Sequence, residues 1–235
     1  MLIATLALTL SFLPVRAEPV EALPFLFEVK DSPSTSPGRT GGEMTPIDAE
    51  RAFAADAKTI GQWTAFRKWS TDDAVMFVPQ PVNAHDFLKD RKDPPRAIDW
   101  WPTAIYVSCD GSVAVNTGGW SRPDGSVGYF TTVWQKQADG SWKWTVDGGG
   151  GLSAPRPRSS VPNVVRAKCS GQIFAPTIYS APPPGSGLTI ESGGSRDNSL
   201  QWYWRVNVDG ARVMAVYLAG TVVIEDTIPG SPANK

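Results

Sequence analysis

Apolar residues recur at helical spacing at the start of the central part of the chain. Thr45 and Asp48 stand three residues apart, as an N-cap residue and its N3 partner do, and Pro46 suits the first helical position. Apolar side chains then follow at intervals of three and four residues and would share one helical face: Ala49, Phe53, Ala57, Ile60, Trp63 and Phe66. The pattern predicts a long amphipathic helix.

A second, shorter helix and a series of strands are predicted after it. Asn83 and Asp86 repeat the spacing of a helix start, and this helix should end before Asp93, which precedes two prolines. Apolar alternation then predicts an antiparallel meander with strands at residues 104–108, 113–117, 127–136 and 142–146, and with glycine-bearing hairpin turns at residues 109–111 and 138–140.

The C-terminal part has the period of β-strands throughout. Residues 200–208 alternate between apolar and polar side chains, and a turn at Asp209-Gly210 should lead into two more strands, at 213–218 and 221–224. A sheet of this kind can pack on the central domain, contact a partner at the cell surface, or bind glycan through exposed tryptophans. Packing is the default expectation, because about 70 residues bury little surface alone.

Proline, glycine and serine divide the chain into modules. Residues 18–44 and 151–164 have the composition of linkers, and the first should be flexible because it cannot bury enough apolar surface to offset its ordering entropy. Between them, residues 45–150 suffice for one hydrophobic core. Residues 165–235 would form the smaller, β-rich module.

The first 17 residues predict export. Residues 1–17 hold an apolar run that leads into small residues around Ala17, which indicates a signal peptide cleaved before Glu18. The run is too short to cross a bilayer, which takes about 20 apolar residues. A membrane-peripheral or unstructured N-terminus is the alternative, because no basic residues precede the run. The expected location is periplasmic or secreted.

Charge and cysteine content narrow the choice of partners. Lys and Arg number 22 against 23 Asp and Glu, so the chain lacks the net positive charge that attracts nucleic acid or a membrane surface. We therefore expect neither a nucleic-acid partner nor a membrane span. Cys109 and Cys169 could form a disulfide in an oxidising compartment, or stay unpaired if their Cα atoms lie too far apart.

Three features of residues 45–150 together resemble a known superfamily. They are the helix that opens with Thr-Pro-Ile-Asp, the run Asp-Asp-Ala-Val-Met-Phe-Val-Pro at residues 72–79, and the tryptophan-flanked hairpin at residues 133–149. In these features the chain resembles the NTF2-like superfamily, and within it the DUF4440 and SnoaL-like domains. The resemblance covers a little under half of the chain. It implies an α+β cone, in which a long N-terminal helix packs on a curved antiparallel sheet and encloses one pocket, followed here by a small all-β module.

Aromatic residues are the candidates for the wall of that pocket. Eight of the ten tryptophans lie between Trp63 and Trp144. Alternation would place Trp142 and Trp144 on one face of a hairpin, with Trp134 opposite them. Such a wall could bind a small hydrophobic or ring-containing molecule, although aromatic residues are also ordinary core material. The candidate ligand contacts are Trp63, Phe66, Trp100, Trp120, Trp134, Trp142 and Trp144.

Two residues are candidates for acid/base chemistry. His85 is the single histidine of the chain, so no metal site that needs two histidines can form. This imidazole could act as a general base, or it could belong to a solvated, charged helix. The resemblance to SnoaL-like cyclases implies a catalytic aspartate on a late strand, where Asp147 stands. An Asp-Gly pair at the end of a strand is more often part of a turn.

One NTF2-like activity finds no support in the sequence. The resemblance to ketosteroid isomerase implies a general base just before Pro79, and Val78 occupies that position. The first helix also offers no tyrosine for the oxyanion.

Two hypotheses therefore stand, with a third beside them. The first is an exported, non-catalytic protein that binds a small hydrophobic or ring-containing molecule without a cofactor. The second is a SnoaL-like enzyme that uses acid/base chemistry on a carbonyl compound, as an isomerase, cyclase or hydratase. A dimerising scaffold is the third.

Overall fold

The computed structural model describes residues 43–169 and 185–230. The expected signal peptide, residues 1–17, and nearly all of the expected linker, residues 18–44, lie outside this part. Among the described residues, no helix has the length and apolar character needed to cross a membrane.

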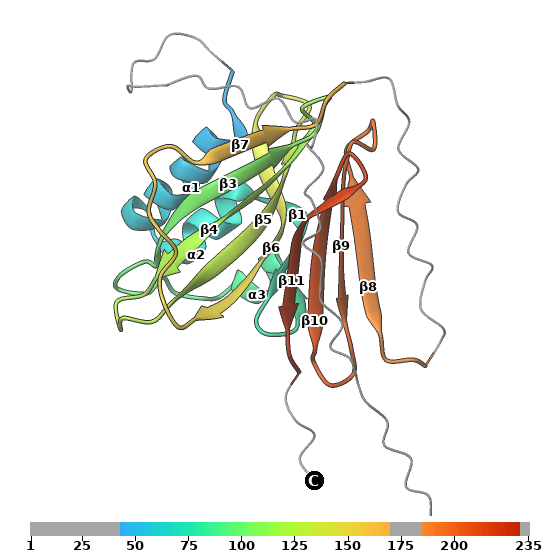
Figure 1. Cartoon of the computed structure of the whole chain (residues 1–235). Helices are drawn as coiled ribbons and strands as arrows, with labels where there is room; N and C mark the ends of the chain where they lie inside the picture. Colours follow the sequence, from blue (N-terminus) through green and yellow to red (C-terminus); the bar gives the residue numbers. More distant parts are fainter. Residues whose placement is uncertain (1–42, 170–184, 231–235) are drawn as a thin grey trace, which may run out of the picture.

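The described chain forms three layers (Figure 1): helices, a seven-stranded sheet and a four-stranded sheet. The helices are α1 (Pro46–Thr59), α2 (Gln62–Trp69) and α3 (Ala84–Leu88). The first sheet contains β1 (Ser70–Phe77), β2 (Pro81–Asn83), β3 (Asp99–Val107), β4 (Val113–Ser121), β5 (Val127–Lys136), β6 (Trp142–Leu152) and β7 (Asn163–Arg166), in the order β2-β1-β6-β5-β4-β3-β7. The second contains β8 (Thr189–Gly194), β9 (Leu200–Val206), β10 (Arg212–Leu218) and β11 (Thr221–Ile228), in the order β11-β10-β9-β8.

The expected long helix is two helices. Thr45 and Asp48 form the predicted capping box at the start of α1. Gly61 then interrupts the helix with a φ of 105°, a conformation that favours glycine. The carboxylate of Asp93 replaces a local cap on α2, because it accepts hydrogen bonds from the backbone N–H groups of Trp63 and Thr64. Periodicity alone could not reveal this break, since the apolar stripe continues across it.

The fold class is α+β with a curved sheet, as expected. Strands β3 to β6 form the predicted antiparallel meander. Two strands at its margins pair in parallel instead, β1 with β6 and β7 with β3. Parallel strands are joined by long connections and not by hairpin turns, so the turn residues in the sequence could not predict these two pairings.

The segment expected to be a linker, residues 151–164, is packed on the first sheet. It begins inside β6 and ends inside β7. Between these strands, Arg156 donates a hydrogen bond of 2.9 Å to Thr117 Oγ1, and Trp101 Nε1 donates one of 3.0 Å to the Pro157 carbonyl oxygen. The guanidinium of Arg158 lies 3.9 Å from the centre of the Trp101 ring. These contacts fix the segment between β6 and β7 on the surface of the first sheet. Strand β7 then extends the first sheet across the expected module boundary at residue 165.

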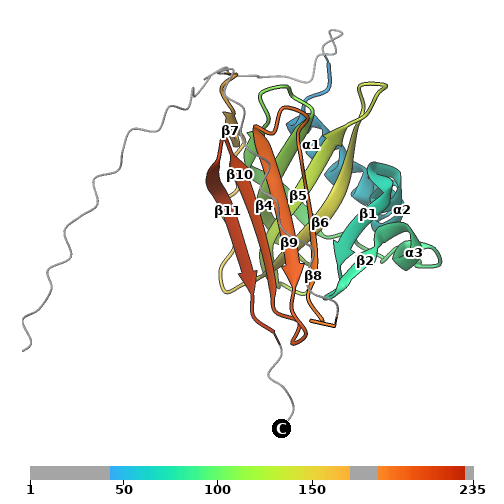
Figure 2. The ribbon, with the colours of Figure 1, turned by 90° about the vertical axis from the view of Figure 1, so that its right-hand side faces the viewer.

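The two sheets share one hydrophobic core, and the helices share another with the first sheet. Figure 2 looks onto the four-stranded sheet, which lies across the face of the first sheet that the helices leave free. Apolar side chains of β4, β5 and β6 pack there against those of β9 and β10, including Val133, Trp202 and Trp204. The C-terminal strands therefore bury their apolar face on the central domain.

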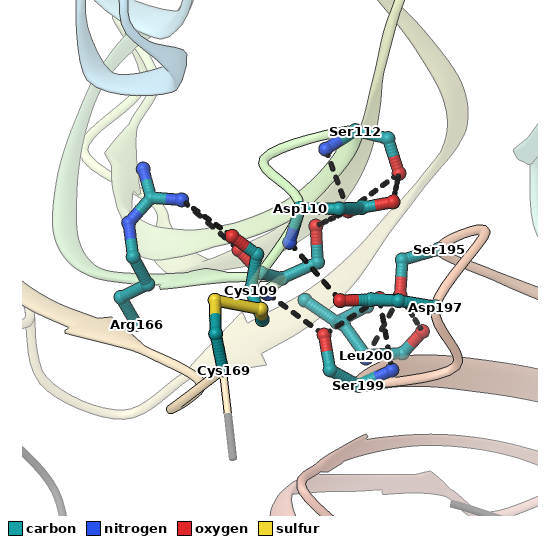
Figure 3. The surroundings of a disulfide bond; sticks show 10 residues. Cys109, Asp110, Ser112, Arg166, Cys169, Ser195, Asp197, Ser199 and Leu200 are labelled. Carbon is teal, nitrogen blue, oxygen red and sulfur yellow. Dashed lines mark hydrogen bonds between the residues drawn. A yellow bond between two sulfur atoms is a disulfide. The ribbon is translucent and has the colours of Figure 1, made fainter. Parts of the chain in front are cut away.

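A disulfide lies where the ends of both sheets meet (Figure 3). Cys109 and Cys169 are bridged, with their Cα atoms 5.2 Å apart. Next to the bridge, the backbone N–H of Cys109 donates to Ser199 Oγ at 2.7 Å, and that of Asp110 donates to Asp197 Oδ2 at 3.0 Å. The turn after β3 is thus bound to the turn before β9.

Candidate functional site

A β-bulge decides which side chain of β6 faces the helices. Between the pairs that Trp144 and Val146 form with β5, strand β6 holds one extra residue, Thr145. Trp144 belongs to the core beneath the helices, whereas Val146 belongs to the core between the sheets. Strict alternation would place Val146 on the side of Trp144. Because the bulge reverses that order, Asp147 lies on the helix side of the sheet.

Asp147 stands on the wall of a cavity of about 330 Å³ between the helices and the first sheet. After Asp147 the wall continues as Gly148–Gly151, so β6 places no further side chain into this space. The other walls are mostly aromatic: Phe53, Trp63, Phe66, Phe77, Trp100, Trp120, Tyr129 and Phe130. An apolar cavity with few polar groups is the usual form of a small-molecule site.

Burial changes the acidity of Asp147. Its carboxylate accepts a hydrogen bond of 2.7 Å from Thr132 Oγ1. Burial raises the pKa of Asp147 to about 7, and the negative charge of Glu50 acts in the same direction, while Thr132 and Arg212 lower it. The group can therefore hold or release a proton near neutral pH, which general acid/base chemistry requires.

Glu50, at the inner end of the cavity, is held by three N–H donors. Its Oε1 accepts from Trp100 Nε1 at 2.8 Å, and its Oε2 accepts from Trp134 Nε1 at 2.8 Å and from Asn116 Nδ2 at 3.1 Å. Burial raises the pKa of Glu50, and the three donors oppose that rise. Because both oxygens are engaged by the protein, Glu50 mainly fixes the aromatic wall.

A second hollow adjoins the cavity. The two share four lining residues: Gln62, Trp63, Ile98 and Arg122. The outer hollow adds the loop of residues 94–96 and the turn of residues 123–124. It therefore forms an approach to the cavity from solvent.

The expected aromatic wall divides into two groups. Trp63, Phe66, Trp100 and Trp120 line the cavity, and they remain the predicted ligand contacts. Trp134, Trp142 and Trp144 do not line it and are almost fully buried in the core beneath the helices. For these three residues the expectation of ligand contact is corrected, because α1 and α2 cover their end of the sheet.

The two candidate proton carriers are also separated. Asp147 faces the cavity, whereas His85, on α3, is not among the residues that line it. The Nε2 atom of His85 lies 2.9 Å from Ser70 Oγ. His85 thus takes part in local packing of α3 on β1, and of the two candidates only Asp147 faces the cavity.

Sequence reasoning missed several residues of the site. Glu50 sits within the apolar face of α1, and a charged residue in such a stripe is a signal of a buried polar contact. The glycine run of residues 148–151 leads into the expected linker and is not among the predicted site residues. Uninterrupted glycine directly after a strand could have indicated a wall that leaves room for a ligand. Nothing in the sequence around Arg212 predicts that this residue, from β10 of the second sheet, acts on Asp147.

Comparisons with known proteins do not identify a family for this chain. No family model matches the sequence, and no curated protein does either. Among solved structures, a putative ketosteroid isomerase from Parabacteroides distasonis ATCC 8503 is similar over 46% of this chain and 85% of that chain, with 17% identity and a TM-score of 0.37. The S. rosetta CaMKII hub is similar over 46% of this chain and 98% of that chain, with 20% identity and a TM-score of 0.34. At such scores these similarities say nothing about activity, ligand or assembly.

Proposed function

We propose that this chain is an NTF2-like protein, of the DUF4440 and SnoaL-like kind, that binds a small ring-bearing molecule in its aromatic cavity. One observation carries the proposal. A cavity of about 330 Å³ between the helices and the first sheet has mostly aromatic walls and holds, besides Glu50, the carboxyl group of Asp147, whose pKa is about 7. This volume lies in the range of sites for small organic molecules, roughly 300–1,000 Å³.

The walls favour a flat, apolar ligand. Ring faces and edges of the wall can pack against a ligand ring at van der Waals distance, and each such aromatic contact contributes about 0.5–1.5 kcal/mol beyond area burial. Asp147 would meet a polar group of the ligand, as a hydrogen-bond donor when protonated and as an acceptor when ionised. A hydroxyl on the ring can pair with both forms of Asp147, and a carbonyl can pair with the protonated form.

A matched pair of phenylalanine variants tests the proposal. Phe66 and Phe87 are both half-buried against the core beneath the helices, but only Phe66 lines the cavity. We expect titration calorimetry with 2-naphthol to show binding that Phe66→Ala weakens about tenfold and Phe87→Ala leaves nearly unchanged. Equal affinities in both folded variants and the wild type would place the ligand elsewhere.

Acid/base catalysis is a second candidate function, favoured by the position and the acidity of Asp147. A carboxyl group with a pKa of about 7 that faces an apolar cavity could move a proton next to the carbonyl group of a bound compound. If so, Asp147→Asn should keep ligand affinity but reduce turnover about 100-fold or more. Retained turnover in that variant would leave binding as the function.

Export is part of the proposal. The bridge between Cys109 and Cys169 supports it, because disulfides persist in oxidising compartments. Cleavage before Glu18 would leave 235 − 17 = 218 residues. Intact-mass measurement on periplasmic or secreted protein should find this chain, and retention of Met1 there would refute the predicted cleavage.

A further inference from the structure

The cavity has a basic group at the end opposite Asp147. Arg122 follows the last residue of β4, Ser121, which lies opposite Val127 of β5, and Val127 lies opposite Leu152 of β6. Leu152 is five residues beyond Asp147, or roughly 16 Å along the strand at about 3.3 Å per residue. Arg122 nevertheless lines the cavity together with Asp147. The long axis of the cavity therefore runs from a carboxyl group to a guanidinium.

The guanidinium of Arg122 is held over the cavity wall and is available to a ligand. It lies 4.4 Å from the centre of the Trp120 ring. That ring is fixed in turn, since Trp120 Nε1 donates a hydrogen bond of 2.9 Å to the Tyr129 carbonyl oxygen. Arg122 is exposed, and among the described residues no carboxylate forms an ion pair with it.

The outer hollow adds a second arginine. Arg96 and Arg122 both line it, with one acidic residue, Asp124. Asp124 is held in its own hairpin turn, where Oδ1 accepts from the backbone N–H and the hydroxyl of Ser126 at 2.9 and 2.7 Å. The outer hollow is thus lined by two guanidinium groups and by one carboxylate that is already hydrogen-bonded to Ser126. Its charged side chains therefore carry a net positive charge.

We propose that the ligand is a ring-bearing carboxylate whose anionic group binds at the mouth of the cavity, between Arg122 and Arg96. This inference rests on the proposed function and names the class of ligand. The ring system would lie along the aromatic walls, and a hydroxyl or carbonyl at its far end would meet Asp147. Guanidinium groups suit a carboxylate because their planar N–H donors match its two oxygens.

Three probes with the same hydroxynaphthalene ring system test the proposal in the mature protein. They are 6-hydroxy-2-naphthoate, its neutral carboxamide and 2-naphthol, which lacks this substituent, each titrated calorimetrically at pH 7.5. We expect the naphthoate to bind about tenfold more tightly than the carboxamide, the usual worth of a charge-assisted hydrogen bond. Because salt screens exposed charges, this preference should shrink between 50 and 300 mM salt, roughly as the Debye length falls.

Charge variants at the mouth identify the groups responsible. Arg122→Gln should remove most of the preference for the naphthoate and leave carboxamide affinity within about twofold, while Arg122→Lys should keep part of it. Asp124→Asn should tighten naphthoate binding, because it removes the opposing charge and keeps an oxygen for Ser126. Arg205→Gln, which removes an exposed arginine from the second sheet, is the matched control and should change neither affinity.

The outcomes separate this inference from the proposed function. Equal affinity for naphthoate and carboxamide, or a preference for the carboxamide, would overturn the anionic ligand and leave the aromatic cavity as a binding site. A preference that survives in folded Arg122→Gln and Arg96→Gln variants would also overturn it. If none of the three probes binds, both the inference and the proposed function fail.

Discussion

Arg212, on the second sheet, donates a hydrogen bond of 2.7 Å from Nη2 to the carbonyl oxygen of Gly149 on the wall of the cavity. The same guanidinium lies 4.2 Å from the centre of the Phe77 ring and donates a longer bond, 3.4 Å, to the Pro79 carbonyl oxygen. A Cβ atom at Gly149 would come within 2.0 Å of the Tyr129 carbonyl oxygen, so only glycine fits at this position. The wall therefore has no side chain here that could pack against its neighbours. The second sheet therefore supports the cavity from behind.

Replacement of this arginine should loosen the wall and change the acidity of Asp147. Arg212→Met removes a buried donor to Gly149, and the unfolding free energy should fall by about 2–3 kcal/mol. The positive charge of Arg212 lowers the pKa of Asp147, so its loss should raise that pKa above its value of about 7. Denaturant unfolding and carboxyl NMR titration measure the two effects. Arg212→Lys is the control, because it keeps the charge and should shift the pKa less.

Stability should depend on pH through Asp147. Its pKa rises from 3.8 to about 7 on folding, so the folded state binds more protons than the unfolded chain between these values. The contribution of Asp147 is then fully present below about pH 4 and is lost as pH rises through 7. Relative to Asp147→Asn, the wild type should lose up to about 4 kcal/mol of unfolding free energy between pH 4 and pH 8.

A second variant distinguishes this effect from that of other carboxyl groups. The hydrogen bond from Thr132 lowers the pKa of Asp147, so Thr132→Val should move the loss of stability to higher pH. A pH dependence that is identical in the wild type and Asp147→Asn would show that Asp147 does not titrate as proposed.

Local sequence features predicted the elements that depend on neighbours in the chain. The Thr45 capping box, the cap of α3 by Asn83 and the hairpin glycines Gly111 and Gly140 all appear where expected, the glycines with φ of 67° and 83°. In these turns an aspartate binds the backbone N–H two residues later, as Asp139 does with Ser141 at 2.9 Å. Such contacts need no distant partner, and single-sequence reasoning therefore finds them.

The site itself depends on contacts that the sequence does not announce. Alternation correctly grouped Trp142 with Trp144, but it could not tell whether their end of the sheet is covered by helices or open. The bulge at Thr145 has no sequence signature here, and without it Asp147 would face the second sheet. The Arg212 contact joins residues 63 positions apart in different sheets.

Glu50 should matter for stability more than for ligand affinity. Glu50→Ala would leave the indole N–H groups of Trp100 and Trp134 buried without an acceptor, at about 1–3 kcal/mol each, whereas Asn116 keeps its bond to the Pro46 carbonyl oxygen. We expect a loss of about 2 kcal/mol or more in unfolding free energy, or failure to fold at 37 °C. Glu50→Gln keeps one acceptor oxygen, so the loss should be smaller. Urea unfolding of both variants measures it, and a wild-type midpoint in Glu50→Ala would contradict the role of this carboxyl group.

The disulfide should stabilise the contact between the two sheets. Cys109 and Cys169 are 60 residues apart in sequence, so the bridge closes a long loop in the unfolded chain, and its removal should cost about 2–4 kcal/mol. The turn contact of Asp110 with Asp197 lies beside it and depends on the same alignment. We therefore expect the double variant Cys109→Ser, Cys169→Ser to have a lower unfolding midpoint than the wild type. Asp197→Ala should lower the midpoint more in this double variant than in the protein with the disulfide. The reason is that the disulfide fixes the turn after β3 and so compensates in part for the lost contact. Equal effects of Asp197→Ala in both backgrounds, measured as a double-mutant cycle, would show that the bridge and the turn contact act independently.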